Sequence, residues 1–164
     1  MNVTTPPPSL PSLLTAPLHL VPSRAHSLVL ATALNRLFTD ELADGEFDFL
    51  EGKVFAIEVR DAPVCCRITL RRDRFSASSR DKADATVSAT VHDFLLLMAQ
   101  QEDPDTLFFQ RRLLISGETD LGLEVKNLLD AVDPEQLPAV VRELLPRAVD
   151  FSQKLLQLLS TRSK

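Results

Sequence analysis

Short stretches of alternating apolar and polar residues fill segment 53–89, and they constrain the fold more than any other feature of the sequence. The stretches are 53–60, 64–71, a short one carrying Phe75 and Ala77, and 83–89. Alternation with a period of two is typical of a β-strand with one buried face. Turns rather than helices separate the stretches, with a tight turn expected at Arg72 and Asp73, so we expect a mainly antiparallel sheet with one face covered.

Helical periodicity lies on both sides of these stretches. Apolar residues at three- and four-residue spacing predict a helix over 23–43, which Asp44 and Gly45 end. Further helices are expected behind Thr90, behind Asp103, over about 119–131, over 135–145 and over 146–161, with one more strand at 113–115. Pro146 suits the first turn of a helix, so we expect it to divide the last two helices. Strands that cluster indicate an α+β fold rather than a doubly wound sheet.

The chain divides into a short leading segment and one domain. A length of 164 residues fits a single domain with a core of its own. Residues 1–22 are rich in proline and leucine, and proline excludes a long helix or a central strand there. They form either a disordered tail or an apolar segment that packs on the domain or touches a bilayer surface. Residues 23–164 form the domain.

Charge and cysteine usage exclude several classes of protein. The net charge of −5 argues against a nucleic-acid partner, because such proteins carry a surplus of Lys and Arg. Cys65 and Cys66 are adjacent, which fits neither a disulfide framework nor a metal site and favours a reducing compartment. We find no signal peptide and no run near the roughly 18 apolar residues of a membrane span. We therefore expect a cytoplasmic protein, with a peripheral contact at the inner face of the membrane left open.

The sequence contains no set of residues typical of catalysis. His19, His26 and His92 fall in separate elements without the spacing of metal ligands. Of the two cysteines, only Cys66 is expected to point into the core, as a structural thiol. The glycines form no phosphate-binding loop. We expect no catalytic residue, no metal and no cofactor, and an enzyme is the weakest of the interpretations considered.

One stretch concentrates positive charge. We call it the basic hairpin, and its residues are Arg67, Arg71, Arg72, Arg74, Arg80 and Lys82. Charged side chains commonly protect an exposed sheet edge from aggregation. The alternative is a docking patch for an acidic partner protein or for anionic lipid head groups.

Several short helices carry more apolar residues than one buried stripe requires. Such a surplus indicates the wall of a cavity, a partner interface or a membrane contact. The candidate lipid-binding residues are Phe94, Leu95, Leu97, Met98, Phe108, Phe109, Leu121, Leu128, Leu144, Leu155 and Leu159. The stretch 146–161 is, in addition, a candidate movable cover or membrane-contact helix.

Three segments carry a resemblance to a known family. They are DGEFDFLEG at 44–52, QEDPDTLFFQRRL at 101–113 and GETDLGLEVKNLLD at 117–130. The chain resembles, over about 25–160, the UbiT-type ubiquinone biosynthesis accessory factors of the sterol carrier protein superfamily. The resemblance implies helices wrapped over a mainly antiparallel sheet to enclose an apolar cavity, and it implies no catalytic residues.

The resemblance also implies a function. The protein would be a non-catalytic carrier that presents polyprenylated ubiquinone intermediates to separate hydroxylating proteins in an oxygen-independent pathway, and phospholipid could occupy the same cavity. The alternative is a protein-interaction subunit that docks a partner enzyme and has no ligand cavity.

Overall fold

The structure is a computed structural model that describes residues 20–161, and the side chains of residues 20–159. The proline-rich segment expected at 1–22 therefore lies mainly outside the described residues, and its boundary stays a prediction. Helix α2 begins at Ser23.

A five-stranded sheet forms the base of the domain. Its strands are β1 (Val54–Val59), β2 (Val64–Leu70), β3 (Phe75–Ala77), β4 (Ala85–Ala89) and β5 (Leu114–Gly117), in the order β3-β2-β1-β4-β5. All neighbouring pairs are antiparallel except β1 and β4, which run parallel with Ile57 opposite Val87. The expected mainly antiparallel sheet is confirmed.

The turn between β2 and β3 follows the prediction. Arg72 and Asp73 both adopt positive φ, at 50° and 56°, and Arg71 and Arg74 exchange backbone hydrogen bonds of 2.9 and 3.2 Å around them. Two-residue hairpin loops favour this geometry because it matches the twist of the flanking strands. Three arginines are thus placed at the tip of a hairpin.

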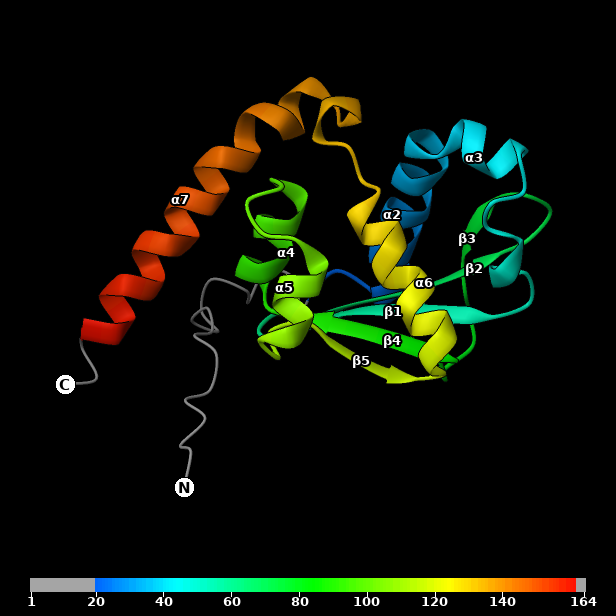
Figure 1. Ribbon diagram of the computed structural model, residues 1–164, viewed down its shortest axis with the longest axis horizontal. Coiled ribbons are helices and arrows are strands. Elements are labelled where there is room, and N and C mark those ends of the chain that lie inside the picture. The colour runs from blue at the N-terminus through cyan, green and yellow to red at the C-terminus, as the bar shows by residue number, and fades with distance from the viewer. Residues whose placement is uncertain (1–19, 162–164) are drawn as a thin grey trace.

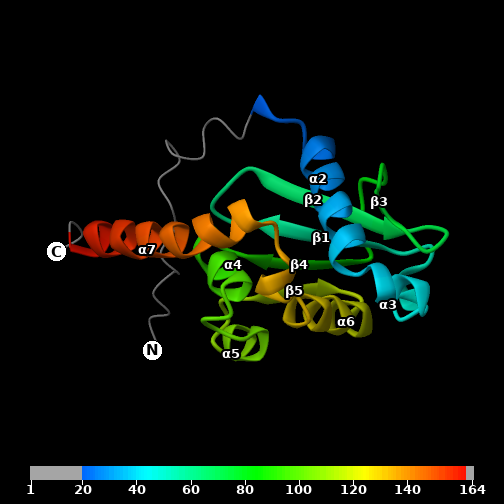
Figure 2. The same cartoon turned by 90° about the horizontal axis from the view of Figure 1, so that it is seen from above.

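Helices cover one face of the sheet (Figures 1 and 2). They are α2 (Ser23–Leu37), α3 (Thr39–Ala43), α4 (Val91–Met98), α5 (Pro104–Phe109), α6 (Thr119–Asp130) and α7 (Ala139–Thr161), with 3₁₀ turns η2 (Asp48–Leu50) and η3 (Pro134–Gln136). Helices α2 and α6 lie over the strands, and α7 extends away from the body of the domain.

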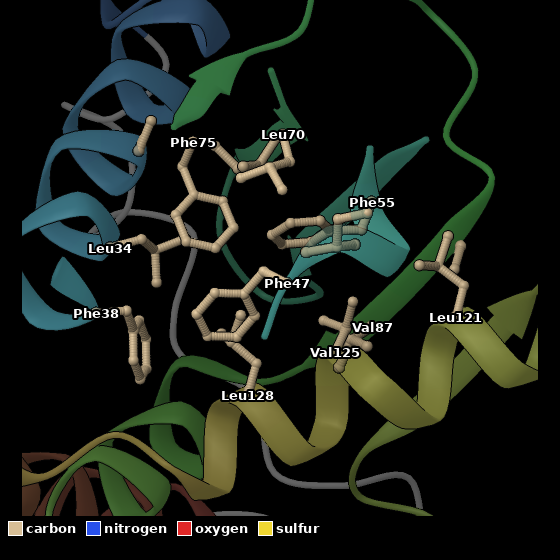
Figure 3. Close-up of a cluster of buried hydrophobic side chains, with 14 of the residues drawn as sticks. Leu34, Phe38, Phe47, Phe55, Leu70, Phe75, Val87, Leu121, Val125 and Leu128 are labelled. Carbon is tan, nitrogen blue, oxygen red and sulfur yellow. The ribbon is translucent and has the colours of Figure 1, made fainter. Parts of the chain in front are cut away.

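The core lies between the sheet and helices α2 and α6 (Figure 3). Phe55, Ile68 and Val87 project from the central strands and are fully buried, while Leu34 and Val125 meet them from the two helices. Burial alternates along β4 as expected, with Ala85, Val87 and Ala89 in the core. In β1, by contrast, the consecutive residues 54–56 are all buried. Cys66 belongs to the buried set, and Cys65 is half-buried on the opposite face.

Two predicted helix boundaries are wrong. The helix expected over 23–43 is divided at Phe38, whose backbone leaves the helical region at ψ 43°. Pro146 does not divide the last helix, because α7 runs through it without interruption. Proline in a helix interior costs roughly 3 kcal/mol. Here Leu145 and Val149 are buried on either side of it, and their packing holds the helix together.

Candidate functional site: an apolar groove beside helix α2

An apolar groove of about 590 Å³ opens between α2, the end of α4 and the connection into α7. Its lining residues are Leu28, Val29, Thr32, Ala33, Arg36 and Leu37 of α2, Met98 of α4, and Gln136, Leu137, Pro138 and Val141. The groove therefore lies on the side of α2 that faces away from the sheet, among helices, rather than between the sheet and the helix layer.

Helix α2 can form this wall because it carries apolar residues on two faces. Ala31 and Leu34 are buried against the sheet, whereas Leu28 and Val29 are 58% and 71% exposed. Helix α2 is fixed to the strands by Asn35, which donates to the carbonyl of Phe75 and accepts from its N–H, each at 2.8 Å. The second apolar face is thereby held toward the groove.

The polar groups of the groove are few. The hydroxyl of Thr32 donates to the Leu28 carbonyl at 2.8 Å, so its hydrogen is used within the helix. Gln136 lies on the connection between α6 and α7. Arg36 is the charged member of the lining, and within the described residues no ion pair involves it. The groove thus combines apolar walls with one cation.

A buried polar network anchors α4, which carries Met98 to the groove. The carboxylate of Asp93 accepts from the Thr90 hydroxyl at 2.7 Å and from Arg112 Nε at 2.9 Å. Arg112 also donates to Glu102 at 3.0 Å. Arg60 donates to the carbonyl of Arg112 at 2.5 Å. The N-terminal end of α4 is therefore tied to the loop that precedes β5.

Several residues of the QEDPDTLFFQRRL segment have structural roles. Asp103 caps α5 by accepting from the N–H of Thr106 at 2.8 Å and from its hydroxyl at 2.7 Å. The hydrogen bonds from Thr106 lower the pKa of Asp103. Leu107 is fully buried, and Arg112 belongs to the network around Asp93. These roles explain the residues without any catalytic chemistry.

A histidine joins α4 to α7. His92 Nδ1 lies 2.8 Å from the hydroxyl oxygen of Ser152, and that hydroxyl donates to the Val149 carbonyl at 2.7 Å. Because the Ser152 hydrogen is already used, His92 Nδ1–H is the donor of the pair. Burial lowers the pKa of His92, although the nearby charge of Asp93 opposes the shift.

The candidate lipid-binding residues are spread over four helices. Met98 lines the groove. Leu97, Leu121 and Leu128 are buried in the core instead, and Phe94, which is half-buried, packs against it. The others are half-buried or exposed on α4, α5 and α7: Leu95, Phe108, Phe109, Leu144, Leu155 and Leu159. Which of these contact a ligand stays a prediction.

The groove residues on α2 and on the α6–α7 connection were not predicted from the sequence. The signal that could have found them is on α2, where Leu28 and Val29 lie outside the stripe formed by Leu30, Leu34 and Leu37. On the connection, Leu137 is buried beside exposed Pro138 and offers no such pattern.

The residues of the basic hairpin lie in three environments. Arg71, Arg72 and Arg74 are exposed at the β2–β3 turn, and Lys82 is exposed farther along the chain. Arg80 instead pairs with Asp84 at 3.2 Å. Arg67 is half-buried in β2. A docking role for these residues stays a prediction.

Burial makes the two cysteine thiols weakly reactive. Burial raises the pKa of Cys66 to about 11 and also raises that of Cys65. Among residues 20–161, no group of three or more His, Cys, Asp and Glu side chains is arranged to hold a metal ion. None of the helices described has both the length and the apolar character needed to cross a bilayer.

Comparison with known proteins gives consistent matches. The SCP-2 sterol transfer family matches residues 31–130. The ubiquinone biosynthesis accessory factor UbiT of Escherichia coli (strain K12) is 43% identical over 141 residues, which cover 86% of this chain and 81% of the relative. Sterol carrier protein 2 of Homo sapiens is 32% identical over 83 residues, which cover 47% of this chain and 15% of that protein.

A solved structure supports the fold. The structure described as UbiJ-SCP2 Ubiquinone synthesis protein matches 80% of this chain and 100% of its own, with a TM-score of 0.50 and 21% sequence identity. At this identity the match concerns the arrangement of helices and strands, and it agrees with the sheet and helix layer described above.

Proposed function

The chain belongs to the SCP-2 sterol transfer family and, within it, to the UbiT-type accessory factors, and from this premise we propose that it is a non-catalytic lipid-binding accessory factor of ubiquinone biosynthesis. Its ligand is a polyprenylated ubiquinone intermediate, which it carries and presents to the hydroxylating proteins of an oxygen-independent pathway. It works in the cytoplasm and in peripheral contact with the inner face of the membrane.

The observation that carries this proposal is the apolar groove. Its volume of about 590 Å³ accommodates a long apolar chain, and its walls are mainly aliphatic. Each CH₂ group transferred from water contributes roughly 0.8 kcal/mol, so several isoprene units supply the affinity without specific polar contacts. This mode of binding is tolerant, and phospholipid chains can occupy the same groove.

The chemistry of the site supports a carrier rather than an enzyme. The thiol of Cys66 is held protonated by burial, and His92, which contacts Ser152 of α7, is not one of the residues that line the groove. Hydroxylation of the bound ring is therefore assigned to partner proteins. A carrier has a physical purpose in such a pathway, because a prenylated phenol is too apolar to diffuse freely through water.

Native mass spectrometry of the purified protein tests the proposal. We expect added mass corresponding to prenylated phenol or phospholipid, or uptake of these lipids on incubation. Ala33→Phe places a ring in the groove and should reduce uptake, whereas Leu123→Phe, at a 40% exposed position on α6, is the matched control. Only ligand-free protein after incubation with both lipid classes would overturn the proposal.

A deletion strain tests the pathway. Loss of the protein should lower ubiquinone in cells grown without oxygen, with an early prenylated precursor accumulating. Levels in aerated cells should change little, because oxygen-dependent hydroxylases cover the same steps. Unchanged anaerobic ubiquinone would exclude the pathway even if the purified protein bound lipid.

A second candidate function is that of an interaction subunit that docks a partner enzyme. Exposed apolar side chains on α5 favour it: Phe109 is 80% exposed and its ring lies 6.0 Å from that of Phe108. In this candidate function, the basic hairpin would supply a positively charged contact to the partner enzyme in addition to the apolar one. Binding of a pathway protein by chains that take up no lipid would favour this candidate.

A further inference from the structure

Helix α7 has two apolar faces, and α4 covers one of them. The covered face carries the buried residues Leu145, Val149, Ser152 and Leu156. Around the helix from this face runs a second apolar row, which we call the outer seam: Val141, Leu144, Ala148, Phe151, Leu155 and Leu158. Within the seam, Leu144, Phe151 and Leu158 are 53%, 60% and 66% exposed.

The spacing of the outer seam is that of a coiled-coil helix. Its residues follow one another at alternating intervals of three and four, which repeats the a and d positions of a heptad. An apolar row with this period is suited to packing against another helix along its length. Pro146 is exposed and falls outside these positions, so its ring leaves the seam open.

Positive charge borders one side of the seam. Ala148 and Leu155 occupy a positions of the heptad. Arg147 and Lys154 directly precede them and so occupy g positions, which flank the apolar row. Both side chains are exposed, and neither takes part in an ion pair among the residues described. From this geometry we infer that the outer seam is the docking surface for an amphipathic helix of a partner protein, with acidic residues beside its own apolar row.

A second copy of this chain fits the seam poorly. Antiparallel pairing of two α7 helices would bring Arg147 and Lys154 of one copy against the same residues of the other, and like charges repel. Parallel pairing would use the opposite flank, where Leu145 and Ser152 are already buried against α4. The charge pattern therefore favours docking of an acidic helix from another protein over pairing with a second α7.

A bilayer is also a poorer match than an acidic helix. Helices that lie on anionic membranes concentrate Lys and Arg on their polar face. The polar face of α7 carries both signs of charge, with Glu143 and Asp150 among its basic residues, so it lacks the uniformly basic polar face of such a helix. The heptad period, in contrast, serves a helix and has no counterpart in a fluid lipid surface.

The seam begins where the groove ends. Val141 both lines the groove and forms the first position of the seam. A helix docked along α7 would thus hold its protein beside the groove opening. The docking itself requires no lipid, so its test is independent of the proposed lipid function.

The probe is a synthetic amphipathic peptide about three heptads long, with leucine in its seam and glutamate at the flanking positions. A matched peptide carries lysine in place of glutamate. We expect the acidic peptide to bind the full-length protein in fluorescence anisotropy and the basic peptide to bind less tightly. Phe151→Ser should weaken binding by about tenfold or more, as for loss of a central aromatic anchor, whereas Leu123→Ser should not. All variants change exposed residues, and circular dichroism checks that they fold.

Charge reversal distinguishes charge-selective docking of an acidic helix from nonspecific hydrophobic binding. The double variant Arg147→Glu and Lys154→Glu should lose preference for the acidic peptide and gain preference for the basic one. The inference would be overturned if the wild type bound the acidic and the basic peptide with equal affinity and if Phe151→Ser left both affinities unchanged. A dimer in sedimentation that Phe151→Ser dissolves would also overturn it, as would a Phe151-dependent binding to phosphatidylcholine–phosphatidylglycerol vesicles without peptide binding.

Discussion

The carboxylate of Asp93, which is 2% exposed, accepts a hydrogen bond from Arg112 Nε at 2.9 Å and so joins the first turn of α4 to the segment before β5. Arg60 contributes a second cation, with its guanidinium 4.0 Å from the same carboxylate. A negative charge thus lies buried between two arginines, and the position of α4 depends on it.

Removing this carboxylate should be strongly destabilising. Asp93→Ala leaves the two arginines without their shared partner and removes the acceptor of the Thr90 hydroxyl. We expect a loss of about 3–5 kcal/mol, the range for breaking a buried ion pair, in urea unfolding followed by circular dichroism. Arg80→Ala, which breaks the exposed pair with Asp84, should cost less than about 1 kcal/mol. Similar losses for the two variants would contradict the role given to Asp93.

The contact between His92 and Ser152 predicts a dependence of stability on pH. Burial lowers the pKa of His92 in the folded protein, so the unfolded chain binds the proton more readily. The free energy that neutral His92 contributes to folding is therefore fully present above the pKa of His92 in the unfolded chain, about 6.5. It is lost as pH falls through the lower pKa of His92 in the folded protein. Urea unfolding between neutral and mildly acidic pH measures it. His92→Asn keeps a donor near Ser152 but cannot titrate, and its stability should fall less over this range.

The close approach of α6 to β5 predicts a steric coupling. A Cβ atom added at Gly122 would meet Cγ2 of Ile115. Gly122→Ala should therefore destabilise the protein by about 1–3 kcal/mol, as overpacking does. In the background of Ile115→Ala the same substitution should cost much less, and a double-mutant cycle measures the difference. Additive effects would show that the backbone moves to make room.

The sequence was sufficient for the parts of the structure that depend on local pattern. Alternation over 53–89 predicted β1 to β4, and the tight turn at Arg72 and Asp73 is present. The motif at Thr90 predicted the start of α4, and its side chain accepts from the N–H of Asp93. Each of these features is fixed by neighbours in the sequence.

The groove and α7 depended on packing between distant residues. Local propensity placed a helix boundary at Pro146, but burial of Leu145 and Val149 against α4 overrides it. The surplus of apolar residues was recognised, yet the sequence could not show that Leu121 and Leu128 enter the core while Leu28 and Val29 face a groove. Both sets have helical spacing, and only the position of α2 relative to α4 and α7 distinguishes them.

The exposed tip of the basic hairpin should affect binding and not folding. Arg71, Arg72 and Arg74 lie at a solvent-exposed turn, where substitutions usually change stability by less than about 0.5 kcal/mol. Changing all three to glutamate should leave the unfolding midpoint nearly constant. If the hairpin docks an acidic surface, the triple variant should lose affinity for a pathway protein or for anionic vesicles. Unchanged binding to both would leave only the edge-protecting role.

Arg36 should make the groove favour ligands with an acidic head group. It is the charged residue of the lining, next to the aliphatic side chain of Leu37, so an apolar tail and an anionic head can be bound together. Arg36→Gln should weaken binding of a prenylated hydroxybenzoate by about tenfold, the cost of roughly 1.4 kcal/mol from one charge-assisted contact. Binding of the corresponding neutral prenylphenol should change little, because the tail supplies its affinity. Arg36→Lys keeps the charge and should retain part of the preference for the acidic ligand.

Tryptophan fluorescence can measure the binding of both lipids. Tryptophan is absent from the chain, so a tryptophan introduced at Thr32 in each background gives a fluorescence signal inside the groove for titrating both lipids. Equal losses for the acid and the neutral ligand in Arg36→Gln would show that the side chain shapes the groove without reading the head group.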